Sequence, residues 1–229
     1  VNSGNANAAT GPEGLEDALL TSRALSGLLD IPENEILLAS TGVIGHRLPV
    51  DRILNGLPRL VAALRPEGME DAEAAIMTTD RFPKMAVATA RLGGRTVTVC
   101  GIAKGAGMIE PHMATMLAFL TTDAVVPRAD LEALFRRAAG STFNAVSVDG
   151  CESTNDTALI LANGVAGNRP IRAGSVDGRR FGALLEEVTG RLARAMAEDG
   201  EGATKRIEIR ITGARTRGEA RRIAYAVAR

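Results

Sequence analysis

The chain has 229 residues and equal numbers of basic and acidic side chains, 27 of each, so its formal net charge is zero. Binding to nucleic acid or to an anionic membrane draws on an excess of positive charge, which this composition lacks. Five Phe, one Tyr and no Trp also provide too few rings for a base-stacking surface. We therefore expect neither nucleic acid nor a membrane as a partner.

The first half of the chain is predicted to contain two helices, a strand and a β-hairpin. Apolar residues at helical spacing cover Glu13–Leu29 and Arg52–Leu64, and a short apolar run predicts a strand over Glu35–Ser40. Two further apolar runs, Lys84–Ala90 and Arg95–Ile102, are separated by a pair of glycines. That arrangement is typical of two strands joined by a tight turn.

The second half is predicted to continue this alternation, in the order strand Met116–Thr122, helix Pro127–Ala139, strands Asn144–Val148 and Thr157–Ala162, helix Phe181–Met196, strand Arg206–Thr212 and helix Gly218–Ala228. We expect the third and fourth of these elements to be antiparallel neighbours, because one short loop joins them. Paired strands with helices between them predict a mixed, layered α/β fold. The periodicity does not define the strand order.

The cysteines and the hydropathy pattern favour a reducing cytoplasm. Cys100 and Cys151 can form one disulfide at most, and a chain of this size does not need it. Neither a signal peptide nor an apolar run of about 18–20 residues is present in the sequence. Val1 in place of Met is typical of a fragment or a trimmed chain.

Small polar residues gather with glycines in several turns, namely Asn2–Asn5, Ser40–Gly42, Thr78–Asp80, Lys104–Gly107, Ser153–Asp156 and Glu201–Lys205. Glycine lets backbone N–H groups face a ligand, and neighbouring hydroxyls and charges can then recognise it. Each turn taken alone is equally typical of an ordinary turn or helix cap. Gly101–Gly107 lacks the Gly-Lys-Ser/Thr ending of a phosphate loop, so a nucleotide site is weakly supported.

Metal and triad chemistry find little support in the sequence. His46 and His112 are far apart, and neither lies in a metal-binding motif. The Gly-x-Ser-x-Gly turn of a serine hydrolase is absent from the sequence.

One longer motif surrounds Thr115. Between Lys104 and Thr122 the chain contains Lys-Gly-Ala-Gly-Met-Ile-Glu-Pro-His-Met-Ala-Thr-Met-Leu. Judged from composition alone, Thr115 would be a β-branched strand residue with a hydrogen-bonded hydroxyl. The segment nevertheless resembles the self-cleavage signature of the ornithine acetyltransferases, the bifunctional glutamate/ornithine N-acetyltransferases of arginine biosynthesis.

The resemblance extends over almost the whole chain. Further blocks match the family in the same order, and they are Asn2–Ala8, Ser40–Gly45, Ala75–Asp80, Val148–Gly150 with Ser153–Thr157, and Glu201–Lys205. The family fold implied is a layered αββα-like sandwich with mixed sheets. Family members are longer at both ends, so a truncated substrate site is expected if this chain stands alone.

The resemblance implies autocatalytic cleavage between Ala114 and Thr115. This cut gives an α portion, residues 1–114, and a β portion, residues 115–229, that together form one intertwined catalytic unit. The halves would associate as a heterodimer and then as a higher oligomer. Once freed, the α-amine of Thr115, with an ordinary pKa of about 7.7–8.0, can serve as the base for its own hydroxyl.

The activity implied is transfer of an acetyl group from N2-acetylornithine to glutamate through an acetyl-Thr115 ester. The resemblance assigns Thr41 and Gly42 to the oxyanion hole, a kind of donor typically worth ~2.7–4 kcal/mol. It assigns Thr78, Lys104 and Glu201, with Thr115, to substrate binding. From charge, Lys104 suits the α-carboxylate and Glu201 the δ-ammonium, and the two pairings can be exchanged. No metal or organic cofactor is implied.

Several alternatives stay open. An amidase or aminopeptidase of the related self-cleaving fold would use water where this reaction uses glutamate. Bifunctional members are also amino-acid N-acetyltransferases that use acetyl-CoA, and no single residue here decides that. A homologue in secondary metabolism and a non-catalytic fragment are further readings. Glu110 and His112 differ from the usual residues beside the cut and are expected to affect cleavage or substrate choice.

Overall fold

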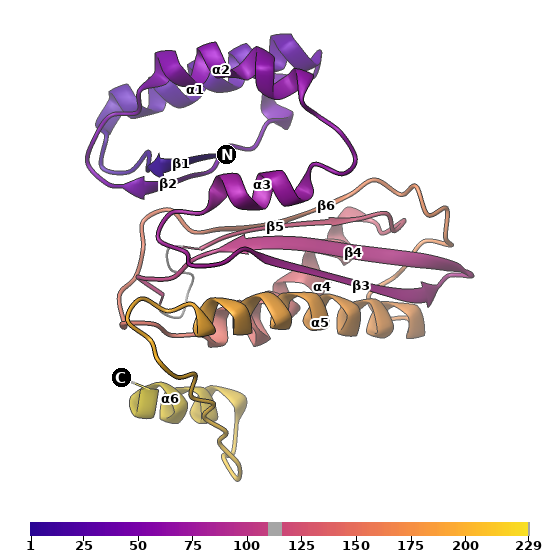
Figure 1. Ribbon diagram of the computed structural model, residues 1–229. Helices are drawn as coiled ribbons and strands as arrows, with labels where there is room; N and C mark the ends of the chain where they lie inside the picture. The colour runs from indigo at the N-terminus through magenta and orange to yellow at the C-terminus, as the bar shows by residue number, and fades with distance from the viewer. Residues whose placement is uncertain (110–115, 229) are drawn as a thin grey trace.

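The computed structural model describes residues 1–109 and 116–228, and its helices and sheets lie in layers (Figure 1). Two helices cover a small sheet, which faces a larger sheet whose opposite face is covered by two more helices. This order of layers confirms the expected αββα-like sandwich with mixed sheets. In the part of the chain that is described, no helix is long and apolar enough to cross a bilayer.

The small sheet pairs β1 (Asn2–Asn5) with β2 (Ser40–Val43) in parallel. Gly42 has φ +126°, and a Cβ on it would lie 2.2 Å from the backbone carbon of Gly4 on the neighbouring strand. Glycine is therefore required at this position, because any side chain would push the two strands apart.

Two helices lie over the small sheet, α1 (Gly11–Leu29) and α2 (Val50–Ala62). Proline in the first turn of α1, together with Glu13, suits a helix start. The helix ends at Asp30, which adopts the left-handed conformation. The predicted helices over Glu13–Leu29 and Arg52–Leu64 are thus confirmed to within two residues at each end.

The large sheet has the strand order β3-β4-β5-β6. Its strands are β3 (Lys84–Leu92), β4 (Arg95–Lys104), β5 (Leu117–Thr122) and β6 (Thr157–Ala162). The first three are antiparallel neighbours, and the last pairs with β5 in parallel. The predicted hairpin is confirmed, with its two turn glycines at positive φ.

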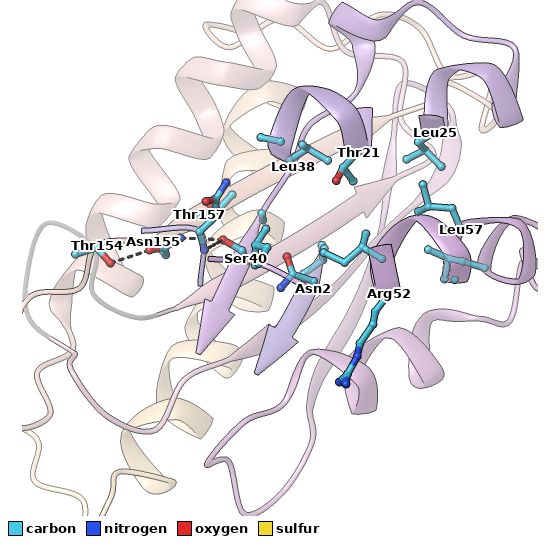
Figure 2. A pocket seen from close by; sticks show the side chains of 18 of the residues that line it. Asn2, Thr21, Leu25, Leu38, Ser40, Arg52, Leu57, Thr154, Asn155 and Thr157 are labelled. Atoms are coloured by element: carbon cyan, nitrogen blue, oxygen red, sulfur yellow. Dashed lines mark hydrogen bonds between the residues drawn. The ribbon is translucent and has the colours of Figure 1, made fainter. Parts of the chain in front are cut away.

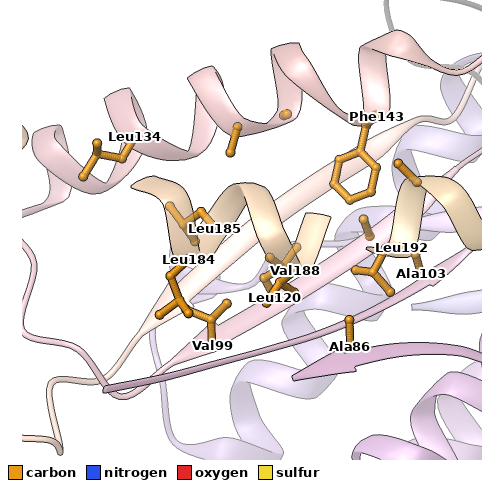
Figure 3. Close-up of a cluster of buried hydrophobic side chains, with 14 of the residues drawn as sticks. Ala86, Val99, Ala103, Leu120, Leu134, Phe143, Leu184, Leu185, Val188 and Leu192 are labelled. Carbon is orange, nitrogen blue, oxygen red and sulfur yellow. The ribbon is translucent and has the colours of Figure 1, made fainter. Parts of the chain in front are cut away.

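The main apolar core lies between the large sheet and α5 (Val176–Glu198) (Figure 3). The helix starts at Ser175, whose hydroxyl accepts a hydrogen bond from the N–H of Gly178 at 2.9 Å. Leu185 and Val188 of the helix are fully buried among sheet residues such as Val99. A second helix, α4 (Arg128–Ser141), packs beside α5 and adds Leu134 to the same core.

β1 and one short helix were not predicted from the sequence. β1 has no apolar pattern, since its residues are Asn, Ser, Gly and Asn. The other is α3 (Met69–Ile76), a two-turn helix that contacts β1, β3 and β4. The chain then ends in α6 (Arg217–Ala228), below the large-sheet layer in Figure 1.

Three predicted strands are wrong. Glu35–Ser40 begins with the last residue of a 3₁₀ turn (Glu33–Glu35), and the strand starts only at Ser40. Asn144–Val148 overlaps the 3₁₀ turn Phe143–Ala145 and makes only an isolated bridge with Ile109. The strand Thr157–Ala162, which was expected to pair with it in antiparallel, exists as β6 but pairs with β5 in parallel.

The third wrong strand is Arg206–Thr212, which has no strand partner among the described residues. Ile207 is 82% exposed, while Ile209 and Ile211 line a surface pocket together with residues of α4 and α6. Two residues of this alternating apolar pattern, Ile209 and Ile211, therefore face helices and not a neighbouring strand.

Candidate functional site

A polar site lies where the end of β4 faces the small sheet. Lys104, the last residue of β4, is 2% exposed, and its Nζ donates hydrogen bonds to Thr78 Oγ1 at 2.8 Å and Thr41 Oγ1 at 3.2 Å. Thr41 comes from β2, and Thr78 follows α3 closely. Three of the predicted site residues, distant in the sequence, are therefore in direct contact.

Asp80 lies behind this cluster and binds several of its members. Its Oδ1 accepts hydrogen bonds from the N–H of Gly105 and from Lys84 Nζ, each at 2.7 Å. Its Oδ2 accepts the N–H of Thr78 at 3.1 Å and lies 3.9 Å from Lys104 Nζ. Burial opposes ionisation, but these hydrogen bonds and the charge of Lys84 hold the pKa of Asp80 below its usual value.

A second buried carboxylate, Asp199, follows α5 and completes the ion network. Lys84 Nζ donates to Asp199 Oδ2 at 2.6 Å, and both side chains are fully buried. Arg81 donates to the same carboxylate from its backbone N–H and its Nε. Burial again opposes ionisation, and the hydrogen bonds from Lys84 and Arg81 outweigh it and lower the pKa of Asp199.

The ammonium of Lys104 is under opposing influences. Burial is the largest, and it lowers the pKa of Lys104 because the charged form loses water. The carboxylate of Asp80 raises the pKa of Lys104, whereas the positive charge of Lys84 lowers it further. The protonation of Lys104 thus depends on the carboxylate beside it.

Glu201 lies at the exposed rim of the site. Its N–H donates to the carbonyl of Ala106 at 2.6 Å, and its Oε1 accepts a hydrogen bond from Thr79 Oγ1 at 2.6 Å. A Cβ on Gly107 would lie 2.8 Å from its carboxyl carbon. The glycine-rich turn after β4 therefore leaves room for this carboxylate, which contacts Thr79, the residue that follows Thr78.

Ala114 and Thr115, and also Glu110 and His112, lie outside the described residues. The described chain resumes at Met116, whose N–H donates to Asp156 Oδ1 at 2.8 Å. Asp156 Oδ2 is buried and has no hydrogen-bond partner within residues 1–109 and 116–228. Burial raises the pKa of Asp156 to about 6, against the opposing effects of the Met116 N–H and the charge of Lys104.

The loop that contains Asp156 is tied to the small sheet. Asn155 Nδ2 donates to Ser40 Oγ at 2.9 Å, as Figure 2 shows, and Ser40 precedes Thr41 on β2. Ser40 Oγ also accepts the N–H of Asn7 at 2.8 Å. The oxyanion-hole candidates Thr41 and Gly42 are therefore held on a strand with contacts to both sides.

A cavity of about 620 Å³ adjoins this loop (Figure 2). Its walls are apolar side chains from α1 and α2, including Leu25 and Leu57, and its floor includes Ser40, Asn155 and Asp156. It is separate from Lys104, Thr78 and Glu201, none of which lines it. Within the described residues, no group of His, Cys, Asp and Glu side chains could hold a metal ion.

Sequence reasoning missed the ion network and Asp156 as site residues. Asp80 and Asp156 lie within blocks that match the family, so their positions could have been noticed. Lys84 and Asp199 carry no such signal, since 115 positions separate them and only the fold brings them together.

The fold and the site define a layered α/β protein with a buried lysine and two threonine hydroxyls between its sheets. A family model described as "ArgJ family" matches residues 1–229. The chain therefore belongs to the ArgJ family, which is the family that the motifs resemble.

Two curated relatives illustrate the match. The arginine biosynthesis bifunctional protein ArgJ of Geobacter sulfurreducens is 53% identical over 228 residues, which are 100% of this chain and 58% of that protein. The protein of the same name from Symbiobacterium thermophilum is 52% identical, over 99% of this chain and 56% of its own length. The chain thus spans little more than half the length of these relatives.

A solved structure of the arginine biosynthesis bifunctional protein argJ from Bacillus halodurans is also similar. It is 44% identical in sequence and has a TM-score of 0.45, with 49% of this chain and 59% of that chain covered.

Proposed function

We propose that this chain forms the nucleophile-bearing part of an acetyltransferase that moves the acetyl group of N2-acetylornithine to glutamate. Thr115 would become an amino-terminal nucleophile by autocatalytic cleavage after Ala114 and would carry the acetyl group as an ester. Membership of the ArgJ family and the names of the relatives, which refer to arginine biosynthesis, support this proposal.

The observation that carries the proposal is the arrangement of charge around Lys104. A buried ammonium between two hydroxyls suits a small carboxylate, since it offers charge-assisted hydrogen bonds at a place shielded from water. Glu201, exposed at the rim, suits a terminal ammonium of the same ligand. Ornithine and its acetylated form contain both kinds of group, which favours an α-amino acid substrate.

Thr41 and Gly42 are proposed as the oxyanion hole for the acyl transfer. The hydroxyl of Thr41 and a backbone N–H of Gly42 would stabilise the charge that develops on the carbonyl oxygen. The hydroxyl of Thr41 accepts a hydrogen bond from Lys104, so its own proton remains available to donate.

Residues 1–114 and 115–229 are proposed as the two products of cleavage, associated as a heterodimer and then as a higher oligomer. The cytoplasm is the proposed compartment, and acetyl-CoA is a proposed second donor. These proposals extend the family resemblance.

Intact-mass spectrometry of the purified, denatured chain tests the cleavage. We expect two species that divide between Ala114 and Thr115, and a single uncut species for Thr115→Ala. Thr115→Ser is the matched control, because it keeps a hydroxyl nucleophile and should cleave. A wild-type chain that stays intact on long incubation would refute the proposed nucleophile.

Acetyl transfer is tested with N-acetylornithine labelled in its acetyl group. The expected product with glutamate is labelled N-acetylglutamate. Labelled acetate formed at the same rate with and without glutamate would favour the amidase alternative, because water would then be the acceptor. Cleavage without release or transfer of the label would favour a non-catalytic fragment.

A further inference from the structure

The buried ion network joins the three segments that position the site. Asp80 lies two residues after Thr78, Lys84 begins β3, and Asp199 lies two residues before Glu201. Lys84 Nζ bridges the two carboxylates at 2.7 and 2.6 Å, with all three side chains fully buried. The described segments that carry Thr78, Lys104 and Glu201 are thus anchored to this network or lie against it.

Asp80 has the central place in this arrangement. Through the N–H of Thr78 and the N–H of Gly105, it holds the backbone on both sides of the hydrogen bond between Thr78 Oγ1 and Lys104 Nζ. Its Oδ2 also faces Lys104 Nζ at 3.9 Å. One carboxylate therefore fixes the geometry of the Lys104 site and supplies the nearest negative charge.

The charged groups around Lys104 affect its protonation in opposite directions. Asp80, Glu201 and Asp156 stabilise the protonated form of Lys104, whereas burial and the positive charge of Lys84 destabilise it. Asp80 acts most strongly among the carboxylates. Asp80 and Lys84 thus act on Lys104 in opposite directions, although both belong to the same buried network.

We propose that Asp80 is a positioning residue that keeps Lys104 cationic and aimed at the substrate carboxylate, while Lys84 and Asp199 hold Asp80 in place. The inference about the substrate rests on the proposed function; the inference about Lys104 itself does not. Lys84 also limits the effect of Asp80, because it shares the charge of that carboxylate.

The test compares the proton affinity of Lys104 in wild type, Asp80→Asn and Lys84→Met. The measured quantity is the pH at which acetic anhydride labels the Lys104 amine at half its maximal rate. The labelled peptide is quantified by mass spectrometry. We expect the midpoint for Lys104 to move down by about one pH unit or more in Asp80→Asn, which is a tenfold change in proton affinity. In Lys84→Met we expect it to move up.

Opposite shifts distinguish this role from simple support of the fold. Loss of structure would expose Lys104 in both variants and move both midpoints toward that of a free lysine. Equal midpoints in all three proteins, or shifts of the same sign, would overturn the proposal. Should Asp80→Asn fail to fold by circular dichroism, Lys84→Met decides. An upward midpoint in a variant whose circular dichroism and thermal unfolding match wild type supports the proposal, and an unchanged or lower midpoint, or an upward one that accompanies loss of structure, overturns it.

Kinetics then test the link to substrate. In Asp80→Asn we expect KM for N-acetylornithine to rise about tenfold, increasingly so at higher pH, with kcat changed far less. Asp17→Asn is the matched control, since Asp17 is also a buried, ion-paired carboxylate but belongs to α1. An unchanged KM in Asp80→Asn would overturn the substrate part of the inference. If the wild-type chain transfers no acetyl group, the proposed function fails, whereas the labelling still decides the role of Asp80.

Discussion

The two halves of the molecule bury their apolar side chains to very different extents. The large-sheet half consists of β3–β6 with α4 and α5, and it encloses most of the buried core. The small-sheet half consists of β1, β2, α1 and α2 with the loops that join them, and its buried hydrophobic residues are only Ala6, Leu48 and Leu57 among those described. Several leucines of α1, including Leu15 and Leu19, are exposed.

Polar contacts compensate in part for the sparse core of the small-sheet half. Lys104 to Thr41 and Asn155 to Ser40 cross from the large-sheet half to β2, and Ser3 donates to the carbonyl of Ala75 just before the site. The site is therefore also a joint between the halves. Global stability therefore depends mainly on the core of the large-sheet half, whereas the site geometry also depends on the polar contacts between the halves.

The largest expected effect is in the core of the large-sheet half. Leu185→Ala should lower the free energy of unfolding by about 3–5 kcal/mol, because a fully buried leucine leaves a cavity. Leu60→Ala in α2 is the control and should cost less than about 1 kcal/mol, since that side chain is 55% exposed. Urea denaturation measures both losses of stability. Equal losses would contradict the conclusion that the large-sheet half holds most of the stabilising core.

A somewhat smaller effect is expected at Gly42. Gly42→Ala should cost about 2–3 kcal/mol, because its φ is positive and the added Cβ would collide with Gly4. Hydrogen exchange should show faster exchange in β1 and β2 with little change in β3–β5. Gly94→Ala, also at positive φ but with open space around it, isolates the collision from the backbone strain. Uniformly faster exchange throughout the molecule would contradict two separable halves.

Asp156 should make stability depend on pH. Its folded pKa of about 6 exceeds the ordinary 3.8, so between these values the folded state binds more protons than the unfolded state. Stability should therefore fall as pH rises from about 4 to 6 and then level off.

Asp156→Asn removes that dependence and keeps an oxygen to accept the N–H of Met116. The pKa shift of Asp156 corresponds to about 3 kcal/mol of unfolding free energy without solvent screening, and to about half of that with it. We expect the variant to be more stable than wild type by that amount above pH 6, as measured by thermal unfolding across the range. A variant that is less stable at pH 7 would show that the carboxylate has a stabilising partner.

The smallest expected effect concerns one link between the halves. Asn155→Ala removes the hydrogen bond to Ser40 and should cost about 1 kcal/mol. Exchange of the β2 amides should respond more than global unfolding does. Thr154→Ala next to it, which loses only a local contact with Asn155, is the control.

Local patterns predicted those elements whose burial follows their own sequence. The stripe of Phe181–Met196 faces a large core, and the glycine pair of the hairpin requires positive φ, so both were predictable. β1 could not be predicted, because its Asn-Ser-Gly-Asn sequence forms a strand only by pairing with β2, almost 40 positions away. Arg206–Thr212 has the pattern of a strand but pairs with no strand within residues 1–109 and 116–228.

The site divides in the same way. Thr41, Thr78, Lys104 and Glu201 were predicted as site residues because their blocks resemble a family, and Lys104 contacts both threonines. Contact between Lys84 and Asp199 depends on how the end of α5 meets the start of β3, which no local pattern encodes. Charge pairs of this kind become visible only with the fold.

The antiparallel pairing of β4 with β5, from Val99 opposite Thr122 to Lys104 opposite Leu117, has a consequence for a chain cut after Ala114. One piece would contain β4 and the other β5, which are the two central strands of the large sheet. The pieces would therefore stay joined after the cut by the backbone hydrogen bonds between these strands. Refolding from denaturant would nevertheless become second order in protein concentration, because the covalent tether between those strands would be gone. The uncut chain would thus fold in a unimolecular reaction, whereas the cut protein, once denatured, could refold only when its two pieces meet in solution.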